Sequence, residues 1–365
     1  MFENFLSVCK DVTKTTRKIP QGEYLSDGTY KIFDQGKNYI GGYCNTANGV
    51  ASDYPYIVFG DHTRVIKYIN EPCYIGADGV KLLKVYNNDF IPKFVYYAML
   101  ANPVEHQGYS RHFKLLKETK IRKYDKSIQN TIIDELDKIN LAISLKESIL
   151  NHLDELVKSR FIEMFGHPDA NEKGWEKSKL ENFINVVGGY AFKSQKYLSK
   201  GIPVLRIGNI NAGYFRDTNL VFYQEDSALE KYKIYPNDLV ISLTGTAGKD
   251  DYGNICLMDS TYGVYYLNQR NAKIEIKHNF NRFFLMYLFA HPEIKQRLTG
   301  KNHGIRQGNI LNKDILELDV YVPPIELQNE FADFVKLIDK SKFIVQKQID
   351  DLQELLDSKM DEYFG

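Results

Sequence analysis

Cysteine is scarce in this chain of 365 residues, and no two cysteines have the spacing of a zinc-ligand pair. The four are Cys9, Cys44, Cys73 and Cys256, and the eight histidines are scattered. A structural zinc site is therefore not expected, and this cysteine usage is typical of a reducing cytoplasm. We predict a cytoplasmic protein without a bound metal.

Segments that could enter a membrane are missing as well. The N-terminal stretch MFENFLSVCKDVTK contains an early acidic residue and no long apolar core, so it predicts no signal peptide. The stretch from Phe280 to Ala290 is apolar but too short to span a bilayer. We therefore expect no membrane partner.

Three catalytic motifs are absent. The only Pro-Pro pair, in 322–325, lacks the polar and aromatic neighbours with which an amino-methyltransferase grips a base. The segment Gly245–Asp250 resembles a phosphate loop, but Leu243 stands where the first glycine is needed and an aspartate follows the lysine. A nuclease-like Glu-x-Lys at 275–277 has no Pro-Asp before it, and strand alternation explains it better. We expect no catalytic site on the chain.

Net charge is zero over the whole chain, which conceals an asymmetry between segments. Residues 1–126 carry 18 Lys and Arg against 13 Asp and Glu, and residues 167–322 carry 20 against 17. Residues 127–166 carry 4 against 7, and residues 323–365 carry 5 against 10. Two mildly basic segments thus alternate with two acidic ones.

The acidic segments are copies of one another. When the chain is shifted by 199 residues, 128–166 aligns with 327–365 without a gap, with 11 identities in 39 columns. Both copies end alike, as SRFIEMFG and SKMDEYFG, and both begin with a Gln-Asn pair. A shared spacing of this kind indicates internal duplication.

Both copies have apolar residues at alternating steps of four and three, which predicts two long helices that pair as a coiled coil. At ~1.5 Å per residue each would be about 55–60 Å long. Lys146 and Lys342 fall within these two apolar stripes, where they either fix the register or extend their amino groups to water. The predicted pairing residues are Ile132, Leu136, Ile139, Ile143, Leu150, Leu153 and Val157 in the first copy, and Phe331, Val335, Ile338, Val345, Ile349, Leu352 and Leu356 in the second.

The basic segments mix short alternating runs with Gly, Asn and Asp turns, which is typical of strands. Examples are 56–59, 204–207, 239–243, 264–267 and 273–276, while 90–100 and 280–289 read as short buried helices at corresponding places. The sequence therefore predicts an α+β chain of four parts: globular domain 1–126, helix 127–166, globular domain 167–322 and helix 323–365. Such a duplication should relate the halves by a pseudo-two-fold axis, with the helices antiparallel.

This order resembles the specificity subunits of type I restriction-modification systems. The resemblance covers essentially the whole chain and is strongest in SIQNTIIDELDKIN with SRFIEMFG, and ELQNEFADFVKLID with SKMDEYFG. YKIFDQGKNYIGGY, VISLTGTAGK and LNQRNAKI also look like recurring blocks of target-recognition domains. The resemblance implies two domains that each read half of a split target in double-stranded DNA, and a chain without catalysis of its own.

The same resemblance implies two methyltransferase subunits as partners, with restriction and translocase subunits joining the complex. The complex would use S-adenosylmethionine, and ATP and magnesium with the restriction subunit, whereas this chain would bind no cofactor. Two other interpretations stay open: a coiled-coil scaffold that binds proteins instead of DNA, and the DNA reader of another restriction class.

Candidate DNA contacts are sought among Lys and Arg for phosphates, and among Arg, Asn and Gln on loops for base edges. Ordinary solvated loops are the alternative for each. In the first domain the candidates are Gln35, Lys37, Asn38, Tyr39, Asn45, His62, Arg64, Tyr109, Arg111 and His112. In the second they are Lys193, Gln195, Lys196, Arg206, Asn209, Thr244, Thr246, Lys249, Gln269, Arg270, Asn271, Arg306, Gln307 and Asn309.

Overall fold

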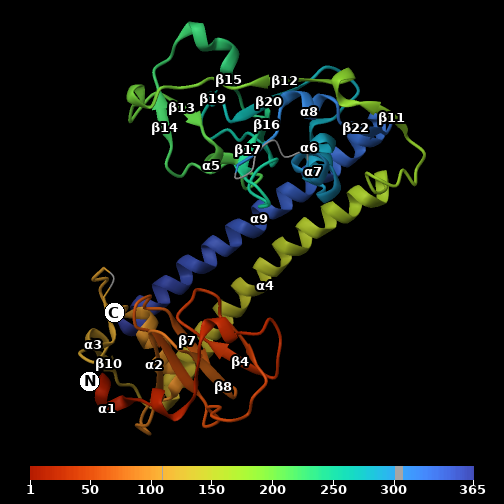
Figure 1. Ribbon diagram of the computed structural model, residues 1–365. Helices are drawn as coiled ribbons and strands as arrows, with labels where there is room; N and C mark the ends of the chain where they lie inside the picture. Colours follow the sequence, from red (N-terminus) through yellow and green to blue (C-terminus); the bar gives the residue numbers. More distant parts are fainter. Residues whose placement is uncertain (109, 301–306) are drawn as a thin grey trace. The chain divides into compact units, whose positions relative to one another are not determined.

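The computed structural model describes residues 1–108, 110–300 and 307–365, and these form two compact units. Unit 1 consists of Met1–Ser148 with Val345–Gly365, and unit 2 consists of Ile149–Ile344. Each unit has a globular part and one half of each long helix, α4 (Lys126–Phe165) and α9 (Ile325–Phe364) (Figure 1). The division differs from the four predicted segments because each half-helix buries its apolar side chains on the globular part beside it.

The globular part of unit 1 contains two four-stranded sheets. One has the order β2-β9-β6-β7 and is antiparallel throughout. The other has the order β3-β8-β4-β5, in which β8 runs parallel to both its neighbours and β4 pairs antiparallel with β5. The strands are β2 (Cys9–Asp11), β9 (Val80–Val85), β6 (Tyr56–Gly60), β7 (Ile66–Ile69), β3 (Lys18–Ile19), β8 (Cys73–Gly76), β4 (Tyr30–Phe33) and β5 (Gly42–Cys44).

Unit 2 repeats this arrangement. Its antiparallel sheet has the order β12-β20-β16-β18, and its mixed sheet has the order β14-β13-β19-β15, in which β13 runs parallel to β19. The two mixed sheets differ in one strand: β3 runs parallel to β8 in unit 1, whereas β15 runs antiparallel to β19 in unit 2. The strands are β12 (Ile184–Gly188), β20 (Asn271–Ile276), β16 (Leu239–Ser242), β18 (Ile255–Leu257), β14 (Val221–Tyr223), β13 (Ile202–Leu205), β19 (Tyr265–Leu267) and β15 (Lys233–Ile234).

Each unit leads into its long helix in the same way. A two-stranded ladder, β1 with β10 in unit 1 and β11 with β22 in unit 2, comes directly before the helix. The mainly apolar helices α2 and α6 lie at the two predicted places, and their inner faces are buried in the core of their own unit. The bounds are β1 (Phe2–Asn4), β10 (Lys120–Arg122), β11 (Glu176–Lys179), β22 (Asp319–Val322), α2 (Pro92–Ala101) and α6 (Arg282–Ala290), with shorter helices α1 (Phe5–Val8), α3 (Phe113–Leu116), α5 (Ile207–Ile210), α7 (Pro292–Thr299) and α8 (Asn312–Leu316).

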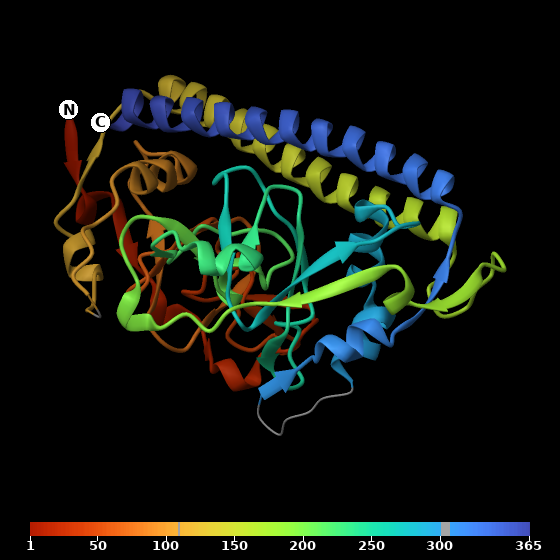
Figure 2. The ribbon, with the colours of Figure 1, turned by 90° about the horizontal axis from the view of Figure 1, so that it is seen from above.

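The two long helices pack antiparallel, as predicted. In unit 1, Lys359 of α9 lies 3.3 Å from Glu135 of α4, and Lys146 donates to the side chain of Gln348 at 2.7 Å. In unit 2, Arg160 lies 3.2 Å from Glu330, and Lys342 pairs with Asp154. Residue numbers rise along one helix as they fall along the other, and both views show the two halves side by side in each unit (Figures 1 and 2).

Lys146 and Lys342 therefore each reach a polar side chain of the opposite helix, at the edge of the apolar stripes. The predicted pairing residues divide into two sets by burial. The buried ones are Ile132, Leu136, Ile139, Val157, Phe331, Val335 and Ile338, and the half-buried ones are Ile143, Leu150, Leu153, Val345, Ile349, Leu352 and Leu356. All of the buried set except Ile139 belongs to the hydrophobic cores of the units, whereas most of the half-buried set does not.

A glutamine at the start of each long helix fixes that helix to its globular part. Gln129 and Gln328 are both fully buried. The Gln129 side chain accepts from the Ile91 N–H and donates to two backbone carbonyls. Gln328 does the same with the Asn281 N–H and the carbonyls of two residues, at 2.9, 3.1 and 2.8 Å. The glutamine that the two copies of the repeat share therefore makes the same contacts in both units, and these contacts link the strand, the long helix and a loop.

We expect Gln328→Leu to lower the free energy of unfolding of unit 2 by about 2–5 kcal/mol. The substitution removes the partner of one N–H and two carbonyls around a fully buried side chain, and each of these groups that is left unsatisfied costs ~1–3 kcal/mol. Denaturant unfolding followed by hydrogen exchange in unit 2 measures the loss. The matched control is Gln353→Leu, an exposed glutamine of the same helix, which should change stability by less than ~0.5 kcal/mol. If the two substitutions lowered the free energy of unfolding equally, Gln328 would not be the residue that fixes α9 to the globular part.

Candidate nucleic-acid interface

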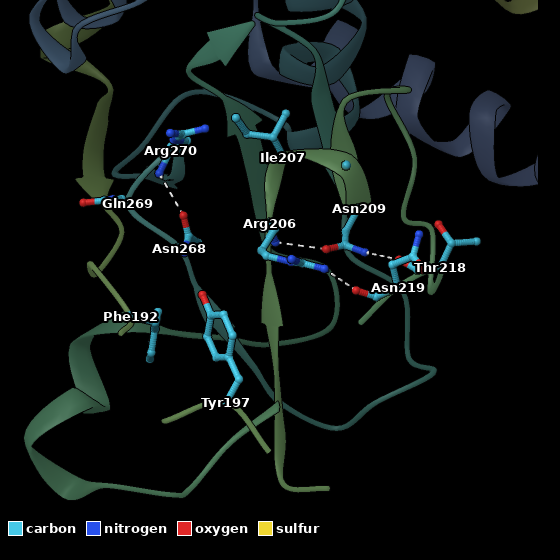
Figure 3. Close-up of a pocket in the computed structure, with 11 residues that line it drawn as sticks. Phe192, Tyr197, Arg206, Ile207, Asn209, Thr218, Asn219, Asn268, Gln269 and Arg270 are labelled. Carbon is cyan, nitrogen blue, oxygen red and sulfur yellow. Dashed lines mark hydrogen bonds between the residues drawn. The ribbon is translucent and has the colours of Figure 1, made fainter. Parts of the chain in front are cut away.

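Polar side chains of unit 2 meet where the parallel strands β13 and β19 end. Arg206 comes directly after β13, and Asn268, Gln269 and Arg270 come directly after β19. Because the two strands are parallel neighbours, these residues lie at one edge of the sheet. They border a hollow of about 480 Å³ (Figure 3). Its lining is Phe192, Tyr197, Arg206, Ile207, Gly208, Asn209, Thr218, Asn219, Asn268, Gln269 and Arg270.

The charge of this hollow comes from two arginines, and no carboxylate is among the residues that line it. The Arg206 side chain donates through Nη2 to the Asn219 carbonyl, and its enclosed Nε has no hydrogen-bond partner among the described residues. Arg270 is exposed, and its backbone N–H donates to the Asn268 side chain at 3.4 Å (Figure 3). Its carbonyl accepts from the Leu243 N–H at 2.9 Å, whereas its guanidinium has no hydrogen-bond partner within the described parts of the chain. The hollow therefore offers unpaired cationic donors to a ligand with acceptor atoms.

Two asparagines that were predicted as DNA contacts are buried here and hold the loops in place. Asn209 is 2% exposed; it accepts from the Arg206 N–H at 3.0 Å and donates to two loop carbonyls. Asn271 is fully buried and donates to the Leu205 carbonyl at 2.7 Å. Neither side chain reaches the surface in this structure. They hold the loops on which Arg206 and Arg270 lie.

A second group of predicted residues in unit 2 is brought together by a short ladder. Strand β17 (Thr244–Thr246) pairs with β21 (Gln307–Asn309), and the buried Thr244 hydroxyl lies 3.2 Å from the Asn309 side-chain oxygen. Gln307 and Lys249 are exposed beside it. Arg306 lies outside the described residues.

The segment 245–250, which was compared with a phosphate loop above, contains the end of β17 and a turn. Gly248 in that turn has φ of +77°, and no helix follows. Thr246 is held by Asp251, which accepts from its N–H at 2.7 Å and from its hydroxyl at 2.8 Å. A phosphate loop has a helix N-terminus behind it, and this segment has none.

The three lysine and glutamine candidates near the short helix Ser194–Lys196 are exposed. Sequence reasoning did not single out Tyr197, which follows this helix, nor Asn219 and Asn268 of the hollow. A signal was available for the tyrosine, since Tyr-Leu-Ser occurs at 24–26 and again at 197–199. The exposed candidates are Lys193, Gln195 and Lys196.

Unit 1 has a corresponding but smaller hollow of about 260 Å³ at the ends of β4 and β8. Two carboxylates, Asp34 and Asp78, line it and no lysine or arginine does, although buried Lys67 lies 3.4 Å from Asp34. Burial, then these two carboxylates, raise the pKa of Tyr24 to about 12, so its hydroxyl stays protonated at neutral pH. The lining is Gln21, Tyr24, Asp34, Gln35, Gly36, Thr63, Gly76, Ala77 and Asp78.

Of the unit 1 candidates, Gln35 lines this hollow. The Gln35 side chain accepts from the His62 N–H at 3.3 Å, and Arg64, with φ of +62°, donates to the Val104 carbonyl at 2.9 Å. His112 is fully buried, with Nδ1 3.0 Å from the Asp61 carbonyl, so it supports its loop and does not reach the surface. Tyr109 lies outside the described residues. The exposed candidates are Lys37, Asn38, Tyr39, Asn45 and Arg111.

Within residues 1–108, 110–300 and 307–365, no group of three His, Cys, Asp or Glu side chains is arranged to hold a metal ion. Nor does any helix in this part of the chain have the length and apolar character needed to cross a membrane.

A family model described as type I restriction modification DNA specificity domain matches residues 172–354, half of the chain. The chain belongs to this family. The resemblance found in the sequence is thereby confirmed, and so is the α+β architecture with two long paired helices.

Individual members of the specificity family resemble parts of the chain. The type I restriction enzyme MjaVIII specificity subunit of Methanocaldococcus jannaschii is 24% identical over 238 residues, which cover 61% of this chain and 55% of that protein. The EcoAI specificity subunit of Escherichia coli is 40% identical over 73 residues, covering 20% of this chain and 12% of that protein. The chain thus spans about half the length of the first relative and less of the second.

Two solved structures share the specificity-subunit fold along the whole chain. A crystal structure of the type I restriction-modification S subunit from M. genitalium has a TM-score of 0.57 at 17% identity and covers 100% of this chain and 96% of that one. A chain from a structure of complex assembly and conformational transition of the type I R-M system also has a TM-score of 0.57, at 14% identity, with 100% and 97% covered. At these identities the likeness concerns the fold alone.

Proposed function

We propose that this chain is the DNA-reading specificity subunit of a type I restriction-modification complex and that each unit reads one half of a split target. The observation that carries the proposal is the duplicated edge of polar loops. In both units a pair of parallel strands, β4 with β8 and β13 with β19, ends at a hollow lined by polar side chains. A protein that reads two unlike half-sites needs two sheet edges that are built alike but carry different side chains.

The hollow of unit 2 is more basic than the chain as a whole, which favours DNA over the alternative of a protein-binding scaffold. Arg206 and Arg270 line it, and Lys193 and Lys196 are exposed near the same loops. Base-edge contacts would come from the loop arginines and Gln269, whereas the exposed lysines suit phosphates. Buried Asn209, Asn271 and His112 would serve the readers indirectly by fixing loops.

The long helices would dock the partners. Apolar side chains on them remain exposed: Leu141 and Leu145 are 60% and 57% exposed in unit 1, and Leu337 and Phe343 are 62% and 72% exposed in unit 2. Exposed apolar side chains that adjoin one another in a patch commonly mark protein contacts. We infer that one methyltransferase subunit docks on each unit. S-adenosylmethionine would then belong to those subunits, and ATP and magnesium to restriction subunits added to the complex.

Salt-dependent binding to duplex DNA tests the proposal. The observed association constant should fall steeply between low and physiological salt, with a log–log slope of about −0.9 for each phosphate contacted. Lys193→Ala combined with Lys196→Ala should make the slope shallower by about 2. The matched control is Lys336→Ala, an exposed lysine of α9 in the same unit, which should leave the slope unchanged. Absence of duplex binding at low salt would favour the scaffold alternative.

A further inference from the structure

The hollows of the two units can be compared residue by residue, because strand registers fix the correspondence. In unit 1 the parallel pair β4 and β8 places Phe33 opposite Ile75. In unit 2 the parallel pair β13 and β19 places Leu205 opposite Leu267. The next strand agrees: Lys31 pairs with Tyr43 in β5, and Pro203 pairs with Phe222 in β14. Phe33 therefore corresponds to Leu205, and Ile75 to Leu267.

Backbone hydrogen bonds outside the strands support the same correspondence. Two residues after Ile75, the Ala77 N–H donates to the Ile19 carbonyl at 2.9 Å. Two residues after Leu267, the Gln269 N–H donates to the Tyr190 carbonyl, also at 2.9 Å. Likewise Tyr24 and Tyr197 each follow a single turn of 3-10 helix and line their own hollow.

The charges at the corresponding positions are opposite. Asp34 follows Phe33 just as Arg206 follows Leu205, and Asp78 stands three residues after Ile75 just as Arg270 stands three after Leu267. Both acidic residues line the hollow of unit 1, and both arginines line that of unit 2. A duplicated backbone thus carries two carboxylates in one copy and two guanidinium groups in the other.

This inversion bears on which part of DNA the edge meets. Every phosphate is an anion, so an edge that met the DNA backbone in both units would suffer repulsion in unit 1, chiefly from Asp78, because Asp34 is already paired with Lys67. Base edges differ, because each base pair presents its own pattern of donors and acceptors in the major groove. Carboxylates accept only and guanidinium groups donate only, so the inverted pair is suited to base edges of opposite character.

We propose that Arg270 reads a guanine in the half-site of unit 2. This inference rests on the proposed function and names the base class that one edge selects. Guanine presents two acceptors in the major groove, N7 and O6, which match the planar fork of an arginine. Arg270 is the reader because its guanidinium is exposed and has no hydrogen-bond partner within the described residues. Arg206 is less free to take this role, since the Asn219 carbonyl already holds one of its amino groups.

The test uses the chain assembled with its methyltransferase subunits. Methylation mapping in cells first gives the target and shows which half depends on unit 2. Duplexes carrying that target are then made with 7-deazaguanine, which lacks the N7 acceptor, at each guanine of this half in turn. For one guanine the wild-type complex should lose roughly 5- to 150-fold in affinity. Arg270→Ala should lose a similar factor on the normal duplex and should then be insensitive to that replacement.

The matched control is Lys231→Ala, an exposed lysine of unit 2 that does not line the hollow, which should keep the full sensitivity to 7-deazaguanine. Thermal melting of the Arg270→Ala chain checks that it remains folded. The inference would be overturned if Arg270→Ala remained as sensitive to 7-deazaguanine as the wild-type chain at every guanine. A half-site of unit 2 without guanine would overturn it too. So would a uniform loss on all duplexes with a shallower salt slope, which marks a phosphate contact. A wild-type complex with no preferred sequence would instead overturn the proposed function, and this inference with it.

Discussion

Replacing Phe331 by alanine should lower the free energy of unfolding of unit 2 by about 3–5 kcal/mol. Phe331 lies in the first turns of α9 and is fully buried. Its ring centroid is 5.5 Å from that of Phe161, 5.4 Å from that of Phe165 and 5.4 Å from that of Tyr287. The substitution removes these contacts and leaves a cavity where α4, α6 and α9 meet, and such cores relax only in part.

Hydrogen exchange resolved by segment can measure this loss within unit 2. Amides of α6 and of the adjoining halves of α4 and α9 should exchange faster. Phe343→Ala is the matched control: this phenylalanine lies in the same helix and unit but is 72% exposed, so stability should change by less than ~0.5 kcal/mol. If both substitutions cost the same, the apolar stripe would not be the contact that joins the helices to the core.

The long helices were predictable because their signal is both periodic and repeated. Apolar steps of four and three over 39 columns exclude strands, and the 199-residue shift shows two such segments in one phase. Antiparallel pairing followed from the internal duplication, which relates the two halves by a pseudo-two-fold axis. The periodicity did not reveal that Gln129 and Gln328 fix the long helices to the globular parts. A glutamine shared by both copies gives no sign in the sequence of whether its side chain is buried or exposed to water.

The strands were located with less accuracy. The run predicted at 204–207 is β13 at Ile202–Leu205, because Arg206 leaves the sheet and its N–H bonds to the Asn209 side chain instead. Pairing between strands far apart in sequence, such as β13 with β19, is decided by the tertiary fold and has no local signal. The sequence therefore indicated Arg206 and Gln269–Arg270 separately, and only the parallel pair places them at one hollow.

Polar residues on loops were the weakest basis for predicting the site. Asn209, Asn271 and His112 have the residue types that read bases, yet each is at most 2% exposed and bonds to backbone groups of nearby loops. A loop that must keep its shape needs buried amides for its own backbone, and composition does not separate this use from DNA contact. Burial separates them, and burial depends on the fold.

Exchanging the globular part of unit 2 should change one half of the recognised sequence completely and leave the other half as it was. The structure indicates where to cut. The Leu180 N–H donates to the Leu318 carbonyl at 3.0 Å, so the ends of segment 180–318 are neighbours. A graft of the corresponding segment from a relative keeps the ladder of β11 with β22 and both long helices. Unit 1 keeps every loop, so its half-site should persist.

Methylome sequencing of cells that carry the chimera with its methyltransferase partner gives the result. The paired variant inserts four residues, about one turn at ~3.6 residues per turn, into each long helix at the boundary between the units. That change leaves both hollows intact, so the bases should stay the same while the gap between the half-sites lengthens. The two variants thus separate base identity, which belongs to the loops, from spacing, which belongs to the helices. A graft that altered both half-sites, or an insertion that altered bases without altering the gap, would contradict a modular reader.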